Sequence, residues 1–436
     1  MKPKLFRDPV HDIVAFDQAD PVERVVFDLI ETSTFQRLRR IRQLGFANLV
    51  YHGAEHSRFA HSIGVLHVAR RICESLELDD NDRLEVLCAA ALHDVGHGPF
   101  SHAIEAVTGV AHERFSRTLV EHPDAEARRL LAGVDETLPE RVARYFGPRR
   151  DFPRQRQVFL DIVSSQLDAD RLDYILRDGL ATGVKIGVYD FERILAMLQI
   201  YEAPPTDDTD GVVRLAVSYR AREAVEGYLI ARFHMFKQVY LHKAVRAAEK
   251  MLEATLRRAA ELVGNDYDFD HPLDPAFRKL VCGEDLTPDE FVAIDDTDVW
   301  VALKKWRHET DPILSTLSAG LLDRKLYKTL DLDPQDPVAI ARLIDRAREL
   351  ARRDGFNPDY AVLVDRASDT PYRPYDPTGG SAPAHIPIID AAGEAIPIEQ
   401  MSDLVHLLGR DAYKIIRLCV PAAIRDELRK VVGIIG

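Results

Sequence analysis

Cysteine is scarce in this chain of 436 residues. Its four cysteines are scattered singly, without the paired spacing of a zinc knuckle or a Cys-x-x-Cys redox motif. They are Cys73, Cys88, Cys282 and Cys419. We therefore expect them to be small buried hydrophobic side chains.

Long apolar runs and an excess of positive charge are also absent. No window reaches the roughly 18 uninterrupted apolar residues that a membrane-spanning helix needs, and residues 1–8 lack the apolar stretch of a signal peptide. The formal net charge of -14 argues against a protein that coats nucleic acid, because nonspecific duplex binding relies on Lys and Arg to neutralise phosphates. The sequence predicts a cytoplasmic protein with no membrane partner, for which nucleic acid is not the favoured partner.

The composition that is present is typical of a globular protein, with 46% hydrophobic and 29% charged residues. A chain of this length is long for one core and indicates two or three packed units. Helical periodicity dominates the first 262 residues. We expect a short strand or turn at 10–16 and helices from about 22 and at 34–44, 63–76, 83–92, 113–121, 156–175 and 221–262.

Beyond residue 265 the pattern changes, because Pro- and Asp-rich punctuation separates short helices. The last part predicts strands at 360–364, 386–389 and 413–420, helices at 401–408 and 422–432, and a loop at 370–383. We expect a mainly α fold with a helical core (1–262), a helical extension (263–345) and a small C-terminal α+β region (346–436).

The segment from Ala91 to His102 holds three histidines and one aspartate directly after an apolar helical run. The adjacent pair His93-Asp94 offers an imidazole and a carboxylate from one helix end, and His97 and His102 follow closely. Imidazole and carboxylate ligands suit Fe, Mn, Zn or Mg, and they suit Cu(I) or an iron-sulfur cluster poorly. Unless the cluster is a chance grouping near a turn, it indicates a metal site.

A catalytic metal site usually has three or four protein ligands and a position left open for water. Two further segments offer the missing ligands, His56 to His61 and Gln166 to Tyr174. In the second segment Asp170 and Asp173 lie on one helix face at i, i+3, whereas Asp168 points elsewhere. We expect one of these carboxylates to complete the metal site.

The order His61, His93-Asp94, Asp170 resembles the H…HD…D signature of the HD-domain phosphohydrolases. The flanking residues resemble one branch of them, the dNTP triphosphohydrolases related to the mammalian sterile-alpha-motif/HD enzyme. The matching segments are 35–39, 43–45, 58–62, 93–102, 112–113 and 168–174. The resemblance runs from about Phe6 to Lys243 and is weaker beyond. It implies a helical HD-domain core and cleavage of dNTPs to deoxynucleoside and tripolyphosphate.

Carried over residue by residue, the resemblance implies that His61, His93, Asp94 and Asp170 hold a divalent metal. Two neutral imidazoles and two carboxylates leave room for water and a phosphate oxygen. A metal held in this way lowers the pKa of its water and draws charge from the phosphoryl oxygens. Mn, Fe, Zn, Mg or Ni all remain candidates, because His and Asp ligands accept several ions.

A second implied set supplies acid and base chemistry. Cleavage next to the nucleoside 5′-oxygen expels a poor alkoxide leaving group, so a positioned proton donor is needed. The set comprises His97, His102, Glu105, His112 and Glu113. Either His102 or His112 fits the donor, with Glu105 or Glu113 to orient it. A zincin HExxH motif fails because Ser116 stands in the place of its second histidine, and His112 also fits a solvated helix start.

The resemblance further implies a substrate pocket. Arg58, Arg171 and Arg232 would surround the triphosphate, because the planar guanidinium suits phosphate oxygens. The sugar would meet Gln43, Leu44, Tyr174, Asp178 and Tyr240, with a tyrosine face excluding a 2′-hydroxyl, and Asp168 is a further substrate-binding candidate. Each tyrosine alone also fits a helix aromatic at the core edge. Phe236 and Leu241 make the base pocket apolar, from which we expect little base selectivity.

Glu31 and Arg39 match an acid and an arginine by which some relatives bind an activating guanine nucleotide between subunits. The implied partners are thus dGTP or GTP and further copies of the chain, as a dimer or tetramer. Both residues fit an exposed helix equally well.

Two alternative functions stay open. One is an HD phosphohydrolase for a deoxynucleoside monophosphate, a cyclic dinucleotide or an alarmone, although a monophosphatase would not need three arginines. The other is a nucleotide-sensing or nucleic-acid-binding regulatory protein with a degenerate site, which the four intact ligands disfavour.

Overall fold

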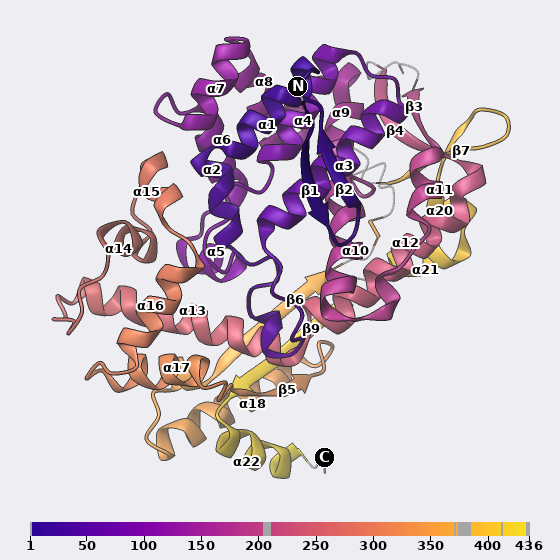
Figure 1. The fold of residues 1–436 in the computed structure, drawn as a ribbon. Coiled ribbons are helices and arrows are strands. Elements are labelled where there is room, and N and C mark those ends of the chain that lie inside the picture. Colours follow the sequence, from indigo (N-terminus) through magenta and orange to yellow (C-terminus); the bar gives the residue numbers. More distant parts are fainter. Residues whose placement is uncertain (1, 204–210, 370–371, 374–384, 411–412, 433–436) are drawn as a thin grey trace.

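Helices form most of the chain, and the described strands form small sheets (Figure 1). The computed structural model describes residues 2–203, 211–369, 372–373, 385–410 and 413–432. The mainly α fold class predicted from the sequence is confirmed. None of the described helices is long and apolar enough to cross a membrane.

The first half of the chain supplies the helices around the candidate site. They are α1 (Pro21–Glu31), α2 (Ser33–Gln36), α3 (Arg58–Ser75), α4 (Asp80–Leu92), α5 (His102–Thr108), α6 (His112–Glu121), α7 (Glu126–Val134), α8 (Leu138–Ala143), α9 (Gln157–Val163), α10 (Ala169–Thr182), α11 (Phe191–Ala196) and α12 (Arg222–Met235). The helices expected at 63–76, 83–92 and 113–121 are therefore confirmed as α3, α4 and α6.

The second half of the chain forms a row of further helices. They are α13 (Lys243–Gly264), α14 (Pro275–Cys282), α15 (Pro288–Ala293), α16 (Asp296–Trp306), α17 (Pro312–Leu322), α18 (Pro337–Arg353), α19 (Pro358–Ala361), α20 (Ile398–Met401), α21 (Asp403–Arg410) and α22 (Ala422–Val432). Their apolar faces build a second core cluster around α13 and α17 and a third beneath the C-terminal sheet.

Helix α3 occupies the centre of the first core, where it packs against both α4 and α10. Its side chains are buried around most of its circumference, as are the last seven residues of α4. This packing brings the first turn of α3, the C-terminal end of α4 and the first turn of α10 together. Cys73 and Cys88 are buried in this core, as expected. Cys419 is buried in the second core cluster, whereas Cys282 is only half-buried.

Three antiparallel or mixed sheets involve the described strands. An N-terminal hairpin pairs β1 (Lys4–Asp8) with β2 (Asp12–Phe16). A four-stranded sheet has the order β3 (Leu198–Ala203), β4 (Val212–Ser218), β7 (Pro387–Ile389) and β8 (Ala395–Pro397), with β4 and β7 parallel. The third sheet places β9 (Tyr413–Val420) between β5 (Lys328–Leu332) and β6 (Leu363–Asp369). Figure 1 shows β7 and α22 at opposite ends of the molecule.

The predicted strands at 10–16, 386–389 and 413–420 correspond to β2, β7 and β9. The strand expected at 360–364 is shifted, because α19 ends at Ala361 and β6 begins at Leu363. The sequence did not predict β3, β4 or β5. Most of the loop expected at 370–383 lies outside the described residues.

Three helices expected from periodicity are shorter or divided in the structure. The helix expected at 156–175 is divided into α9 and α10, and Asp168 caps α10 by accepting hydrogen bonds from the backbone N–H groups of Arg171 and Ser165 at 2.8 and 2.7 Å. The helix expected at 221–262 breaks after a π-helical turn, Phe236–Tyr240. The segment 34–44 forms only α2 and the 3-10 turn Arg37–Arg40.

Candidate active site

The site begins at His61, in the first turn of α3. Ser57 caps this helix by accepting a hydrogen bond from the backbone N–H of Ala60, which fixes where the turn starts. His61 Nε2 lies 2.9 Å from Asp170 Oδ1, and Nδ1 lies 2.8 Å from Asp173 Oδ2. Burial opposes charge on this ring, yet the two carboxylates raise the pKa of His61 to about 10. A metal at Nε2 must therefore displace a proton.

His93 presents a bare nitrogen to the same place. It directly follows α4, and its Nδ1–H donates to the carbonyl oxygen of Ala90 at 2.7 Å. Its Nε2 is buried and has no hydrogen-bond partner among the described residues. That nitrogen lies 3.4 Å from Asp94 Oδ1 and 3.9 Å from Asp170 Oδ1. A buried lone pair that faces two carboxylates fits a metal ligand, because an unsatisfied buried polar atom is otherwise costly.

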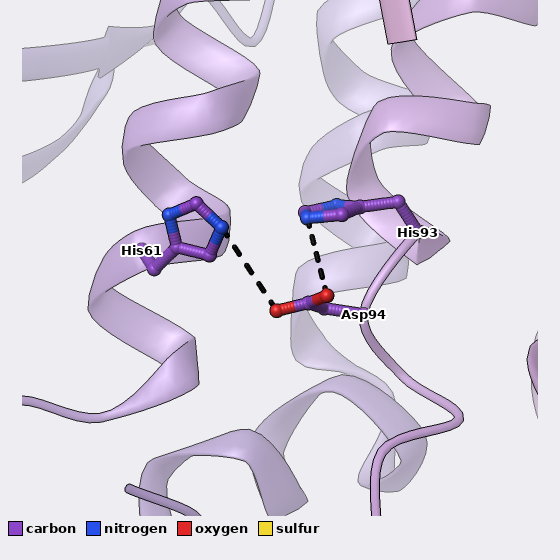
Figure 2. A group of neighbouring side chains, drawn as sticks. All are labelled: His61, His93 and Asp94. Atoms are coloured by element: carbon purple, nitrogen blue, oxygen red, sulfur yellow. Dashed lines mark ion pairs between the residues drawn. The ribbon is translucent and has the colours of Figure 1, made fainter. Parts of the chain in front are cut away.

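Figure 2 shows His61 from α3 and His93 and Asp94 from the end of α4 turned toward one another. Each offers a ligand atom, and these atoms all lie within 4.8 Å of one another. Burial disfavours a charged Asp94, but the nearby Arg58 guanidinium and histidines hold its pKa well below the usual value. Asp170 adds a side chain that is 32% exposed, so the group is open to solvent on that side. All four predicted ligands are thus brought together, in a donor set that suits a divalent metal.

Two histidines stack beside this group. The rings of His97 and His112 are nearly parallel, with centroids 3.7 Å apart. His97 Nε2 lies 3.3 Å from Asp94 Oδ1, and His112 Nδ1 lies 2.8 Å from Glu105 Oε1. Asp94, His97 and His112 form a second group with ligand atoms within 4.8 Å.

The environments of the stacked rings differ in charge. Burial, reinforced by Arg58, lowers the pKa of His97 well below its usual value. Burial also opposes charge on His112, but the hydrogen bond with Glu105 and other carboxylates raise its pKa. His112 is therefore the member that carries a proton more readily, which suits a general acid.

The remaining members of the predicted acid and base set are less central. Glu113 is 53% exposed, with Oε2 3.5 Å from His112 Nδ1. His102 begins α5, and its side chain lies outside the part of the chain that the structure describes.

The loop between α4 and α5 depends on a glycine. A Cβ on Gly96 would lie 2.1 Å from the carbonyl oxygen of His112 and 2.3 Å from the backbone nitrogen of Ser116, so only glycine permits this approach to α6. Ser116 Oγ accepts from the Gly96 N–H at 3.0 Å and donates to the carbonyl oxygen of His93 at 3.1 Å. Phe100 and Ser101 adopt φ values of 51° and 40°, a strained conformation common at functional sites.

The three predicted phosphate-binding arginines differ in their partners. Arg58 is buried, with Nη1 2.5 Å from Asp94 Oδ2 and Nη2 2.8 Å from Ser101 Oγ. Arg171 follows Asp170 on α10, and its Nε is 3.6 Å from Asp168 Oδ2. The guanidinium of Arg232, on α12, lies 5.4 Å from the centre of the Phe236 ring.

Tyr174 connects the arginines to the metal group. Its ring lies edge to face with His61, 6.3 Å between centroids. Burial raises the pKa of Tyr174 to about 12, although Arg232 and Arg171 oppose this shift. Asp168 is buried as the cap of α10, and burial raises its pKa to about 7, while Arg171 opposes this rise. The contacts of Asp168 are those of a helix cap, and its role toward a substrate stays a prediction.

The predicted sugar-binding residues form a connected string. Tyr240 Oη donates to Asp178 Oδ2 at 2.7 Å, and the other oxygen of Asp178 lies 2.8 Å from His56 Nε2. The carbonyl oxygen of His56 accepts from the Gln43 N–H at 3.0 Å, and Gln43 Oε1 is buried without a partner among the described residues. Leu44 packs against Ala47, Ala54 and Val245 at the border of this string.

His56 and Asp173 are contributors that sequence reasoning missed as site residues. His56 precedes His61 by five residues, outside α3, and only its contact with Asp178 gives it a role. Asp173 was noted for sharing a face with Asp170, which was the available signal, but its contact with His61 Nδ1 required the structure.

Comparison with known families identifies two matching regions. An HD domain matches residues 58–144, and an HD associated region matches residues 190–433. The first match includes His61, His93 and Asp94, and HD domains are known to bind divalent metals.

Individual relatives extend the match. The uncharacterized protein YwfO of Bacillus subtilis (strain 168) is 35% identical over 408 residues, covering 92% of this chain and 88% of that protein. A deoxynucleoside triphosphate triphosphohydrolase SAMHD1 homolog of Dictyostelium discoideum is 29% identical, and the match covers 75% of this chain but only 60% of the relative. The crystal structure of a phosphohydrolase from Bacteroides thetaiotaomicron VPI-5482 is similar with a TM-score of 0.78 at 30% identity, covering 96% of this chain and all of that chain.

Proposed function

Because this chain belongs to the HD-domain family of phosphohydrolases, to which the deoxynucleoside triphosphate triphosphohydrolases are related, we propose that it cleaves dNTPs to deoxynucleoside and tripolyphosphate. The observation that carries the proposal is the bare, buried Nε2 of His93. It faces Asp94 and Asp170 beside the buried Arg58 guanidinium, so metal ligands and a phosphate-binding group converge.

His61, His93, Asp94 and Asp170 would hold the divalent metal, which could be Mn, Fe, Zn, Mg or Ni. A metal in this set would acidify its water and withdraw charge from phosphoryl oxygens. Arg58 keeps Asp94 ionised at 2.5 Å and is ready to bind a phosphate oxygen in the same place.

His112 would donate the proton that the departing nucleoside 5′-oxygen needs. Glu105 holds Nδ1 of that ring at 2.8 Å, which leaves Nε2 as the donor. The stacked His97, buried and neutral, and His102 would contact the phosphates, and Glu113 would add negative charge near His112.

The triphosphate would meet Arg58, Arg171 and Arg232, and the sugar would meet Gln43, Leu44, Tyr174, Asp178 and Tyr240. Asp168 is a further proposed substrate-binding residue. Three arginines exceed what a monophosphate requires, which favours a triphosphate over a deoxynucleoside monophosphate. The tyrosine pair is the basis for favouring deoxy substrates, since its rings crowd the sugar position.

We also propose a regulatory nucleotide, dGTP or GTP, between copies of the chain. Glu31 and Arg39 are exposed, and the Arg39 guanidinium lies over the Phe59 ring at 3.5 Å. A hollow of about 250 Å³ elsewhere is lined by five basic side chains and by no acidic one. They are Lys243, Arg324, Lys328, Arg425 and Arg429. Figure 1 shows α1, whose last residue is Glu31, far from α22, whose residues Arg425 and Arg429 line this hollow.

Two experiments test these proposals. The purified chain is incubated with each dNTP, each NTP and candidate monophosphates in the presence of Mn, Mg, Fe, Ni or Zn, and the products are separated by chromatography. Tripolyphosphate with free deoxynucleoside supports the proposal, whereas orthophosphate released from a monophosphate contradicts it. For regulation, dGTP should accelerate dATP hydrolysis and shift the chain to a larger size in gel filtration. The absence of both changes would contradict the regulatory site.

A further inference from the structure

We propose that Asp173 is a positioning residue for the metal site, and that a buried network with Arg177, Asp8 and His11 holds it in place. The inference rests on the proposed metal site. It adds a network of buried side chains that extends from that site to the N-terminal hairpin. Asp173 lies on α10, three residues after Asp170, and its side chain is fully buried.

His61 divides its two nitrogens between the two aspartates. Nε2 faces Asp170, which is half-buried and reaches solvent, while Nδ1 donates to the buried Asp173 at 2.8 Å. A carboxylate on Nδ1 fixes the ring orientation and leaves the Nε2 lone pair for a metal, and it raises the basicity of that nitrogen. Asp173 thus acts on a metal through His61, without offering it an oxygen.

Both oxygens of Asp173 are themselves fixed. Arg177 donates Nε to Oδ2 at 2.8 Å and Nη2 to Oδ1 at 2.9 Å, a bidentate contact one helical turn along α10. His11 Nε2 lies 2.7 Å from the same Oδ1. The side chains of His11 and Arg177 are 4% and 2% exposed, so water competes little for these bonds.

Asp8 ties this network to the N-terminal hairpin. Its two oxygens accept from Arg177 Nη1 and Nη2 at 2.8 and 3.1 Å. One of these oxygens also accepts from the backbone N–H groups of Val10 and His11, which shapes the turn between β1 and β2. The network therefore ends at the tip of the hairpin.

The absence of a side chain at Gly64 leaves space for Asp173 and Arg177. It lies almost one turn after His61 on α3, and a Cβ there would stand 1.9 Å from Asp173 Oδ1 and 2.3 Å from Arg177 Nη2. Any side chain at this position would displace the carboxylate that holds His61. The glycine therefore serves the contact between α3 and α10 at the level of the metal group.

The test measures metal binding without substrate, on the full chain. Asp173→Asn removes the charge but keeps the shape, and Arg177→Lys and His11→Gln loosen the carboxylate from outside. The matched control is Asp365→Asn, which removes another fully buried carboxylate, one on β6 that pairs with Arg246 of α13. Mn dissociation constants are determined by competition with a chelating dye, and thermal unfolding is recorded for each metal-free chain.

Asp173→Asn should weaken Mn binding by about 10- to 100-fold, the effect usual for a group that orients a ligating histidine. Arg177→Lys and His11→Gln should show smaller losses, and Asp365→Asn should bind Mn like the wild type. Equal Mn affinity in Asp173→Asn and wild type would overturn the inference, as would an equal loss in Asp365→Asn. A wild-type chain that binds no divalent metal would instead contradict the proposed metal site itself.

Discussion

Tyr240 Oη donates a hydrogen bond to Asp178 Oδ2 at 2.7 Å, which joins the end of the π-helical turn to α10. The bond fixes the tyrosine ring edge to face with Tyr174, 6.1 Å between centroids, on the side of the site where His61 lies. The break that ends the helical run after α12 therefore has a consequence for the site, since a continuous helix would carry Tyr240 elsewhere.

Tyr240→Ala should relax the preference for deoxynucleotides. In the proposed pocket the Tyr240 ring would lie against C2′ and leave no space for a 2′-hydroxyl, so its removal should open that space. We expect the ratio of kcat/KM for dATP over ATP to fall about tenfold or more, in the range of steric discrimination by a pocket. Tyr240→Phe keeps the ring and loses only the bond to Asp178, so it should retain most of the preference. An unchanged ratio in Tyr240→Ala would count against the assignment.

Asp94→Ala should remove metal and activity together. Asp94 is the one residue common to both groups of ligand atoms, and the Arg58 guanidinium lies beside it. Loss of the charge stabilisation that a metal supplies, several kcal/mol, corresponds to at least about a hundredfold in kcat. Metal content is measured by elemental analysis, with Asp365→Asn as the control that should stay loaded. Wild-type metal content in Asp94→Ala would refute the ligand assignment.

Local spacing and the family resemblance together predicted a set of ligand residues, but not how the chain brings those residues together. His93 and Asp94 are adjacent, so one helix end presents both, and periodicity alone predicts α4. Asp170 and Asp173 were expected on one face, and both do reach His61. Contacts between distant segments, such as His11 with Asp173, have no signature in a single sequence.

The helix breaks escaped prediction because apolar periodicity continues through them. Residues 156–175 keep an amphipathic pattern, but the Asp168 carboxylate captures two backbone N–H groups and starts a new helix. After Met235 the periodicity also persists, while the chain adopts a π-helical turn and His242 caps α13. Both interruptions place predicted site residues, Asp170 and Tyr240, at helix ends.

His112→Gln should lower kcat without changing metal content. Loss of a general acid typically costs about 10²- to 10⁴-fold in rate, and the loss should be smaller for substrates with a better leaving group. The control is His122→Gln, at the exposed end of the same helix. A result of two metal ions per wild-type chain and one per His112→Gln chain would contradict the role of His112 as an acid. It would instead indicate that Asp94, His97 and His112 hold a second metal ion.

His67 should make the fold less stable as pH falls from about 6.5 to about 4. Burial, together with the electrostatic influence of His11 and Arg70, lowers the pKa of His67 to about 4, and Arg70 Nη2 lies 3.1 Å from its Nδ1. Between the two values the unfolded chain binds a proton at His67 and the folded chain does not, so acid favours unfolding. Below about 4 both states are protonated and the dependence ends.

Replacement of His67 by Gln, which can still accept from Arg70, should make this pH dependence shallower. Urea unfolding midpoints are compared for wild type, His67→Gln and the exposed-site control His122→Gln. The measurements are made at about pH 7.5, 6.5, 5.5 and 4.5, so that they cover most of the interval between the two pKa values. The wild type and the control should lose stability in parallel, and His67→Gln should lose less, because it lacks the unfavourable charging of His67 in the folded state. Parallel curves for all three chains would show that His67 titrates alike in both states.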